Sequence, residues 1–189
     1  MEKKLRVKIS KLLSYALRHR PEKFNIILDK NGWVTVQDLL NNCRKEIKFD
    51  FQDLKEVVEN CDKQRFQISE DGSKIRANQG HSVKVDLGLT PIIPPQYLYH
   101  GTAERFFDSI KKEGLKKMNR HDVHLYEEKH IKKARNTGER HQKGSRGLIL
   151  VINAAEMIKD GFVFYKTENE VYLTDSVPNQ YITKQEINE

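Results

Sequence analysis

Three side chains with phosphate-binding chemistry, Arg18, His19 and Arg20, stand in a row directly before Pro21. Guanidinium groups pair with phosphate oxygens as bidentate forks, and an imidazole gains or loses a proton near neutral pH. The row therefore has the composition of a phosphate site. Taken alone it is also explained as a helix C-terminus, where a cation gains about 0.3 to 1 kcal/mol from the helix dipole.

A second polar group lies further along, at Arg65, Arg76 and the run NQGHS at 78–82. If these residues converge with Arg18 and His19, Arg65 completes a set of two guanidiniums and an imidazole around one phosphate. The alternatives are an exposed arginine for Arg65 and an ordinary polar turn for 78–82.

The segment YHGT brings together His100, Gly101 and Thr102 where a strand is expected to end. A glycine permits close approach of a ligand to the backbone, and a hydroxyl at a helix start suits a dinucleotide. The alternative for His100 is a structural histidine with satisfied hydrogen bonds. A third cluster, NRHDVHL at 119–125, places Arg120 before a strand in which Asp122 and His124 share one face. Its alternative is a basic loop leading into an edge strand.

Several histidines and carboxylates crowd the segment after His121, so a zinc site has to be weighed. In a strand, His121 and His124 face opposite sides, and the two cysteines, Cys43 and Cys61, lie far away in the sequence. We therefore expect no metal.

The charge of the chain is unevenly distributed. The 189 residues carry a formal net charge of +7. Residues 105–146 contribute +7, whereas residues 147–189 contribute −4. One positive face is therefore expected, which favours a polyanionic ligand. The chain has no apolar run long enough to span a membrane and no signal-peptide core near its start, so a cytoplasmic protein is expected.

The elements expected to hold the first cluster make up residues 1–88. Apolar residues at helical spacing predict a helix from about Arg6 that Pro21 ends. A short strand at 33–35 follows, then helices opened by Thr35 and Asp50, the second carrying Phe51 inward. The segments 65–69 and 74–78 alternate around a turn and predict a hairpin. Helix, strand, two helices and hairpin together predict a winged-helix lobe.

Residues 89–96 contain three prolines and predict a linker. Beyond it, 97–189 predicts a mostly β lobe with one or two helices. Thr102 is expected to cap a helix that buries Phe106 and ends at Gly114. Further strands are expected at 122–126, 147–153, 162–167 and 170–177, with a basic helix at 128–137. The fold class expected is α+β.

Six segments in one order, LRHRP, KQRF at 63–66, IRANQGHS at 75–82, YHGT, NRHDVHL and ENEVYLTDSVP at 168–178, resemble those of the RNA 2′-phosphotransferase family. The resemblance implies a winged-helix RNA-binding lobe followed by an ADP-ribosyltransferase-like, NAD-binding lobe. It implies that an internal RNA 2′-phosphate, of the kind left at a splice junction, is transferred to NAD in two steps without a metal. The products would be RNA with a free 2′-OH, nicotinamide and ADP-ribose 1″,2″-cyclic phosphate.

The resemblance also implies site residues. The phosphate-handling set falls on Arg18, His19, Arg65 and Arg120. NAD binding falls on His100, Gly101, Thr102, His124 and Val171. RNA binding is expected at Arg76, Gln79, His81 and Ser82. We expect the protein to act as a monomer, with RNA carrying an internal 2′-phosphate as its partner and no membrane partner.

Val171 stands where protein-modifying ADP-ribosyltransferases commonly have a glutamate, although Glu170 is adjacent. A shift of one residue would exchange the faces of the two side chains. Val171 is predicted to face inward, because Leu173 then shares its apolar side.

Two other functions remain open at this point. An ADP-ribosyltransferase acting on protein or on terminal phosphates of nucleic acid would use the same second lobe. A winged-helix nucleic-acid binder would read bases from its second helix, but 51–60 is acidic on balance and poorly suited to phosphate contact.

Overall fold

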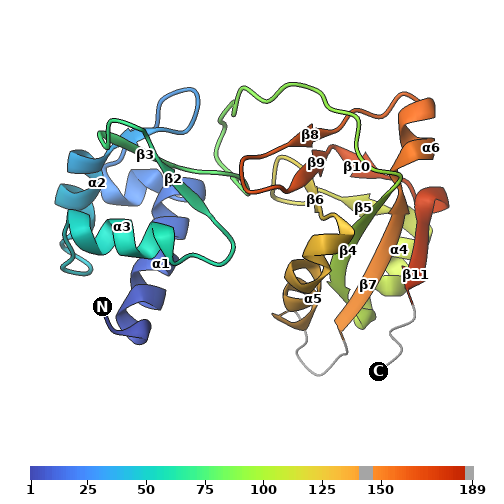
Figure 1. Ribbon diagram of the computed structural model, residues 1–189, viewed down its shortest axis with the longest axis horizontal. Helices are drawn as coiled ribbons and strands as arrows, with labels where there is room; N and C mark the ends of the chain where they lie inside the picture. The colour runs from blue at the N-terminus through green and yellow to red at the C-terminus, as the bar shows by residue number, and fades with distance from the viewer. Residues whose placement is uncertain (141–146, 186–189) are drawn as a thin grey trace. The chain divides into compact units, whose positions relative to one another are not determined.

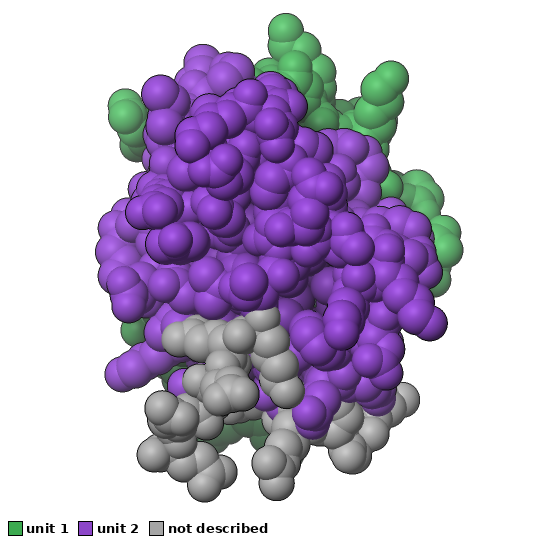
Figure 2. Space-filling view, turned by 90° about the vertical axis from the view of Figure 1, so that its right-hand side faces the viewer, with its two compact units in different colours: residues 1–88 green, residues 89–189 purple. Residues whose placement is uncertain are grey.

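The structure, a computed structural model, describes residues 1–140 and 147–185 (Figure 1). The chain divides into two compact units, residues 1–88 (unit 1) and 89–189 (unit 2), which Figure 2 shows in different colours. Both units combine helices with small sheets, and every strand pair among the described residues is antiparallel. The predicted α+β class is therefore confirmed, whereas the winged-helix and ADP-ribosyltransferase-like assignments stay predictions.

Unit 1 contains three helices, a 3₁₀ turn and a three-stranded sheet in the order β1-β3-β2. Its elements are α1 (Lys3–Arg18), the 3₁₀ turn Pro21–Phe24, β1 (Val34–Thr35), α2 (Val36–Cys43), α3 (Phe51–Glu59), β2 (Phe66–Ile68) and β3 (Lys74–Ala77).

Local sequence signals set the ends of these helices. The side chain of Thr35 accepts a hydrogen bond from the Asp38 N–H, and Asp50 and Asp53 form a reciprocal capping box. α1 ends at Arg18, because Arg20 precedes Pro21 and has left the helical region at φ −143°. These ends confirm the predicted starts at Thr35 and Asp50 and the basic cluster at the end of α1, whereas α1 itself begins at Lys3, three residues before the predicted start.

The core of unit 1 gathers the apolar faces of the three helices against the sheet. Its fully buried members on α1 are Ile9, Leu13, Ala16 and Leu17. Leu54 and Val57 of α3 are also buried, but Phe51 is 40% exposed, so its predicted inward position is wrong. Phe51 is the first residue of α3, and its ring lies beside Gly72 of the β2–β3 turn, where an added Cβ would come within 3.7 Å of it.

Unit 2 contains eight short strands and three helices among its described residues. The strands are β4 (Tyr97–Ala103), β5 (Leu115–Lys116), β6 (Val123–Leu125), β7 (Gly147–Asn153), β8 (Tyr165–Lys166), β9 (Tyr172–Thr174), β10 (Ser176–Val177) and β11 (Ile182–Gln185). The helices are α4 (Phe107–Glu113), α5 (Ile131–Arg140) and α6 (Ala154–Lys159), with 3₁₀ turns at Glu104–Phe106, Glu128–His130 and Asn179–Tyr181. None of the described helices in either unit has the length and apolar character needed to cross a membrane.

The strands of unit 2 form three sheets, in the orders β11-β7-β4, β6-β9-β8 and β10-β5. Tyr99 and Tyr126 exchange two backbone hydrogen bonds, at 2.8 and 2.9 Å, and so join β4 to the segment directly after β6. This junction brings the predicted histidine strands, β4 and β6, together.

The central strand β7 buries both of its faces. Leu148, Leu150 and Ile152 belong to one apolar cluster, which includes residues of α4 and α6, whereas Ile149 belongs to a second cluster with Ala134 of α5. Figure 1 shows α5 beside β4 and β7. The predicted buried position of 147–153 is confirmed.

Three expectations for unit 2 are wrong. Thr102 does not cap a helix, because β4 continues through it and pairs it with Leu148. Phe106 ends the 3₁₀ turn and is 43% exposed rather than buried. The unit has three described helices instead of one or two, because α6 was not predicted.

The proline-rich segment 89–96 forms no helix or strand, and it packs on unit 2. Ile92 donates its backbone N–H to the Phe164 carbonyl at 2.8 Å, and Leu89 contacts the apolar cluster around Val171.

Candidate active site

The first predicted cluster lies where α1 ends. Arg18 is the last residue of α1, and His19 is its C-cap. The Arg18 guanidinium donates from Nη2 to the Arg65 carbonyl at 3.2 Å and lies 5.8 Å from the centre of the Phe66 ring. The structure therefore brings Arg18 to the start of β2, as the convergence hypothesis requires.

Arg65 stands directly before β2 and is held at both its backbone and its side chain. Its backbone N–H and its Nη1 donate to Cys61 Sγ, at 3.4 and 3.2 Å. Its carbonyl accepts from Arg18 and from the Asn78 N–H at 2.9 Å. The thiol of Cys61, which sequence analysis did not single out, thus contacts a predicted catalytic arginine.

The run 78–82 connects these residues through backbone groups. Ser82 donates its N–H to the Arg18 carbonyl at 2.8 Å, and its Oγ lies 3.0 Å from His19 Nδ1. Gly80 has a φ of +84°, and a Cβ placed there would lie 3.5 Å from the Arg18 guanidinium. Asn78 is 8% exposed and donates from Nδ2 to the Gln64 carbonyl at 2.7 Å. Arg18, His19, Arg65 and Ser82 therefore form one hydrogen-bonded group, called the phosphate cluster below.

The remaining predicted RNA-binding residues lie in different surroundings. His81 is 2% exposed and packs inside unit 1, with its Nε2 beside Gly32. Arg76 lies on the opposite face of β3 from the buried Ile75 and Ala77. There it donates to Gln67 Oε1 at 3.2 and 3.3 Å, and its guanidinium lies 4.6 Å from the centre of the Trp33 ring. Gln79 is half-buried.

In unit 2, the predicted NAD-binding histidines are linked by a chain of hydrogen bonds. His100 Nδ1 lies 2.9 Å from the His124 carbonyl, and the Arg120 Nη1 lies 3.4 Å from His124 Nδ1. A carbonyl only accepts and a guanidinium only donates. His100 therefore carries a proton on Nδ1, whereas His124 accepts at Nδ1 and, when neutral, carries its proton on Nε2. Arg120 itself is exposed, and His124 is 8% exposed.

Gly101 and Thr102 serve the packing of α5 on β4. A Cβ on Gly101 would lie 1.7 Å from the carbonyl oxygen of Ala134, and one on Gly138 would lie 2.6 Å from that of Thr102. Only glycine allows backbones to come this close. The close approach that the sequence suggested at Gly101 is therefore to a helix of the same unit.

Val171 is 2% exposed and packs with Leu173 in the apolar cluster beneath α5, so its predicted inward face is confirmed. Glu170 has a φ of +61°, and its carboxylate pairs with Lys129 Nζ at 2.8 Å and His130 Nε2 at 2.6 Å. The hydrogen bonds from Lys129 and then His130 lower the pKa of Glu170 to about 2.

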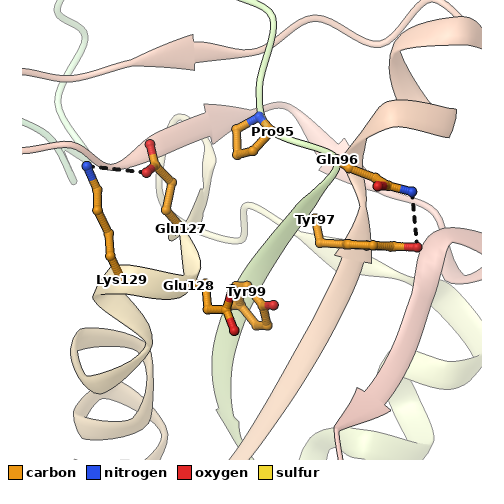
Figure 3. Close-up of a pocket in the computed structure, with 7 residues that line it drawn as sticks. All are labelled: Pro95, Gln96, Tyr97, Tyr99, Glu127, Glu128 and Lys129. Carbon is orange, nitrogen blue, oxygen red and sulfur yellow. Dashed lines mark hydrogen bonds and ion pairs between the residues drawn. The ribbon is translucent and has the colours of Figure 1, made fainter.

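A pocket of about 340 Å³ opens beside β4, lined by Pro95, Gln96, Tyr97, Tyr99, Glu127, Glu128 and Lys129 (Figure 3). None of the predicted NAD-binding residues lines it. Two carboxylates against one ammonium make it unfavourable for a pyrophosphate. Glu127 is also engaged already, by Lys166 at 3.0 Å and the Tyr172 hydroxyl at 2.8 Å. We therefore do not assign this pocket to the predicted dinucleotide.

The crowded histidines and carboxylates after His121 do not meet in one place. Within residues 1–140 and 147–185, no three His, Cys, Asp or Glu side chains are grouped as metal ligands. His130 instead pairs with Glu170. The absence of a metal from the reaction stays a prediction.

Comparison with known proteins agrees with the motifs. Residues 4–176 match the model of the family described as RNA 2′-phosphotransferase, Tpt1/KptA family. A probable RNA 2′-phosphotransferase of Trichormus variabilis is 49% identical over 183 residues, covering 96% of this chain and 98% of the relative. One of Flavobacterium johnsoniae is 48% identical over 185 residues, with the same coverage. One of Fusobacterium nucleatum is 44% identical over 177 residues, covering 93% of this chain and 97% of the relative.

Proposed function

The chain belongs to the RNA 2′-phosphotransferase family, and from this premise we propose that it transfers an internal 2′-phosphate of RNA to NAD. The observation that carries the proposal is the phosphate cluster, in which Arg18, His19 and Arg65 are tied together through hydrogen bonds to one another or to Ser82. Two guanidiniums and an imidazole in one hydrogen-bonded group have the chemistry to bind a dianionic phosphate.

In the first step, an oxygen of the RNA 2′-phosphate attacks C1″ of the nicotinamide ribose, and the bond from C1″ to nicotinamide breaks. The nucleophile is already an anion, so it needs to be positioned and does not need a general base. The arginines would supply this positioning through paired hydrogen bonds.

In the second step, the ribose O2″ attacks phosphorus, and the bond from phosphorus to the RNA O2′ breaks. The O2″ proton leaves, and O2′ gains a proton as RNA with a free 2′-OH departs from ADP-ribose 1″,2″-cyclic phosphate. Negative charge gathers on the phosphoryl oxygens in this step. Fixed guanidiniums stabilise such charge better than water that must reorient. We assign Arg18, Arg65 and Arg120 to this role and His19 to proton transfer.

The donors and acceptors of unit 2 suit NAD in their chemistry. Because His100 donates from Nδ1 to the His124 carbonyl, Nε2 is the acceptor nitrogen of its neutral ring, the kind of atom that pairs with a ribose hydroxyl. The exposed Arg120 offers a cation beside His124. NAD itself supplies the C1″ electrophile and the nicotinamide leaving group. Gly101, Thr102 and Val171 would shape this region through the packing of α5 and β9.

Unit 1 would then act as the RNA-binding lobe and unit 2 as the NAD-binding lobe. Arg76 and Gln79 have the exposure to contact RNA directly, and Ser82 is exposed beside His19. The buried His81 would act on RNA only through the loop that it supports.

A glutamate-based transfer to protein is disfavoured by the position of Glu170. Its carboxylate is occupied by Lys129 and His130, and the adjacent inward position is taken by Val171. Using Glu170 in catalysis would require breaking its contacts with Lys129, His130 and, at 3.7 Å, Lys166.

The test is incubation of the protein with a short RNA carrying one ³²P-labelled internal 2′-phosphate, with and without NAD, in EDTA. The proposal expects NAD-dependent appearance of label in ADP-ribose cyclic phosphate, despite EDTA. Unchanged RNA in the presence of NAD would contradict it. Parallel RNAs phosphorylated at a 5′ or 3′ end distinguish the alternative acceptor, because their labelling by NAD would place the transfer on terminal phosphates.

A further inference from the structure

The hydroxyl of Ser82 lies near two polar groups of the phosphate cluster. Its Oγ lies 3.0 Å from His19 Nδ1 and 3.4 Å from the Arg18 carbonyl oxygen. The backbone N–H groups of Ser82 and Val83 donate to the same carbonyl, at 2.8 and 3.3 Å. The backbone of Ser82 is thus fixed, and its hydroxyl lies between an imidazole nitrogen and a carbonyl.

The single proton of the hydroxyl limits how these bonds can be arranged. The carbonyl can only accept, so if Ser82 donates to it, His19 must donate from Nδ1 to Ser82 Oγ. If Ser82 donates to His19 instead, Nδ1 carries no proton. A doubly protonated His19 also donates from Nδ1, so it fits only the arrangement in which Ser82 donates to the Arg18 carbonyl. In that arrangement, Nε2 of His19 can gain and lose a proton while the hydroxyl keeps its orientation.

The position of Arg18 favours the same arrangement. Its carbonyl belongs to the last turn of α1, a helix of 16 residues, where the helix dipole leaves partial negative charge. A hydroxyl proton directed at this carbonyl is therefore favoured. In this arrangement, neutral His19 has its proton on Nδ1 and a lone pair on Nε2.

We propose that Ser82 is a positioning residue that holds His19 in the Nδ1-protonated tautomer, so that Nε2 accepts the O2″ proton in the second step. The part concerning O2″ rests on the proposed function, whereas the tautomer does not. A base whose other nitrogen is fixed by a third group is a recurring arrangement in acid–base catalysis. Ser82 was predicted from sequence to bind RNA, and that role makes a different kinetic prediction.

The tautomer is tested by ¹⁵N NMR of the histidine rings in the full chain above the pH at which His19 titrates. His19→Asn identifies the signals. We expect the Nδ1-protonated form in the wild type and in Ser82→Thr, which keeps the hydroxyl. In Ser82→Ala we expect a shift toward the Nε2-protonated form. Ser73→Ala is the matched control, because Ser73 is exposed in unit 1 and its side chain bonds to Asp71 within the β2–β3 turn. A His19 tautomer that is the same in the wild type and in Ser82→Ala would overturn the proposal.

The catalytic part is tested by single-turnover kinetics with 2′-phosphorylated RNA and NAD. Ser82→Ala should slow the second step about 10-fold and leave the first step unchanged. The expected loss is smaller than the rate factor of a whole general base, because His19 itself is still present. ADP-ribosylated RNA would then accumulate, and Ser82→Thr would restore the wild-type pattern. A raised KM for RNA with unchanged step rates would instead assign Ser82 to RNA binding and overturn the proposal. If the wild type itself shows no NAD-dependent reaction, the proposed function fails, while the NMR result still decides the tautomer.

Discussion

The predicted phosphate-handling residues of unit 1 stand where elements end, whereas the predicted NAD-binding residues of unit 2 stand mainly within strands. Arg18, His19 and Arg65 lie at the end of α1 and before β2, and loop groups bond to their backbone carbonyls or side chains. His100 and His124 lie inside β4 and β6, with the glycine of β4 pressed against α5.

The two groups of residues are therefore held in place in different ways. At the ends of elements, hydrogen bonds to the backbone hold the chain in place, so the charged side chains there bury little surface. Within the strands of unit 2, predicted site residues and packing residues are neighbours, because Gly101, which packs against α5, directly follows His100. Substitutions in the phosphate cluster should therefore change activity more than stability, and substitutions at Gly101 should do the reverse.

Gly101→Ala should have the largest effect. Its Cβ would overlap the Ala134 carbonyl at 1.7 Å, and backbone cannot move aside as a flexible side chain does. We expect unit 2 to lose roughly 3 kcal/mol or more, measured by amide hydrogen exchange in β4 and β7. Gly161→Ala is the comparison, because its Cβ enters open space at φ +87° and costs only left-handed strain, about 1 to 2 kcal/mol. Equal losses in the two variants would contradict the packing argument.

Arg120→Ala tests the proposed role of Arg120 in phosphate transfer. Because Arg120 is exposed, we expect little change in stability, but a loss of about 10²- to 10³-fold in transfer, the usual cost of removing one charge-stabilising donor. The measurement is single-turnover transfer of ³²P from 2′-phosphorylated RNA. Arg105→Ala, an exposed arginine of the same unit, should keep the wild-type rate. Normal transfer by Arg120→Ala would contradict the assignment of Arg120 to phosphate transfer.

Asn78→Ala should weaken unit 1 and disturb the position of Arg65. Asn78 is buried, and its side chain satisfies the carbonyl of Gln64, the residue before Arg65. The net loss of such a hydrogen bond costs about 0.5 to 1.5 kcal/mol. Urea unfolding followed by the fluorescence of Trp33, the only tryptophan in the chain, reports on this unit. Asn42→Ala, which removes an exposed bond to Asp38, should cost much less, and an equal cost would count against a special role of Asn78.

Glu170→Gln should have the smallest effect. The folded pKa of Glu170, about 2, lies below its ordinary value of 4.5, so its pairing stabilises unit 2 above pH 4.5 and is lost as pH falls toward 2. Because the side chain is partly exposed, we expect only about 0.5 to 1 kcal/mol. Hydrogen exchange should show the difference from the wild type at pH 6 and a smaller one at pH 3. Glu168→Gln is the control in the same turn, and a difference that grows as pH falls would contradict the account.

The helix ends were predictable because their signals are local. Thr35 with Asp38, and Asp50 with Asp53, each specify a helix start within four residues, and Gly114 ends α4 at φ +76°. The start of α6 carried the same kind of signal, Asn153 accepting from the Glu156 N–H, but the apolar run of β7 leads straight into it and hides the boundary.

Other features depend on distant contacts and could not be predicted. Thr102 had the residue type of a helix cap, but its pairing with Leu148 across the sheet extends β4. Phe51 and Phe106 have the residue type of core positions, but both are exposed at the starts of α3 and α4. The approach of Ala134 to Gly101, the thiol of Cys61 beside Arg65, and the bond of Ser82 to His19 join residues that no periodicity relates.

The central claim is that the phosphate cluster stabilises the second step of transfer, and single-turnover kinetics of Arg65→Ala test it most directly. RNA, ADP-ribosylated RNA and cyclic phosphate product are resolved over time, with Arg44→Ala, an exposed arginine of unit 1, as the control. The account predicts that ADP-ribosylated RNA accumulates because the second step slows about 10²-fold or more, while Arg44→Ala behaves as the wild type. Completion of both steps by Arg65→Ala at the wild-type rate would contradict it.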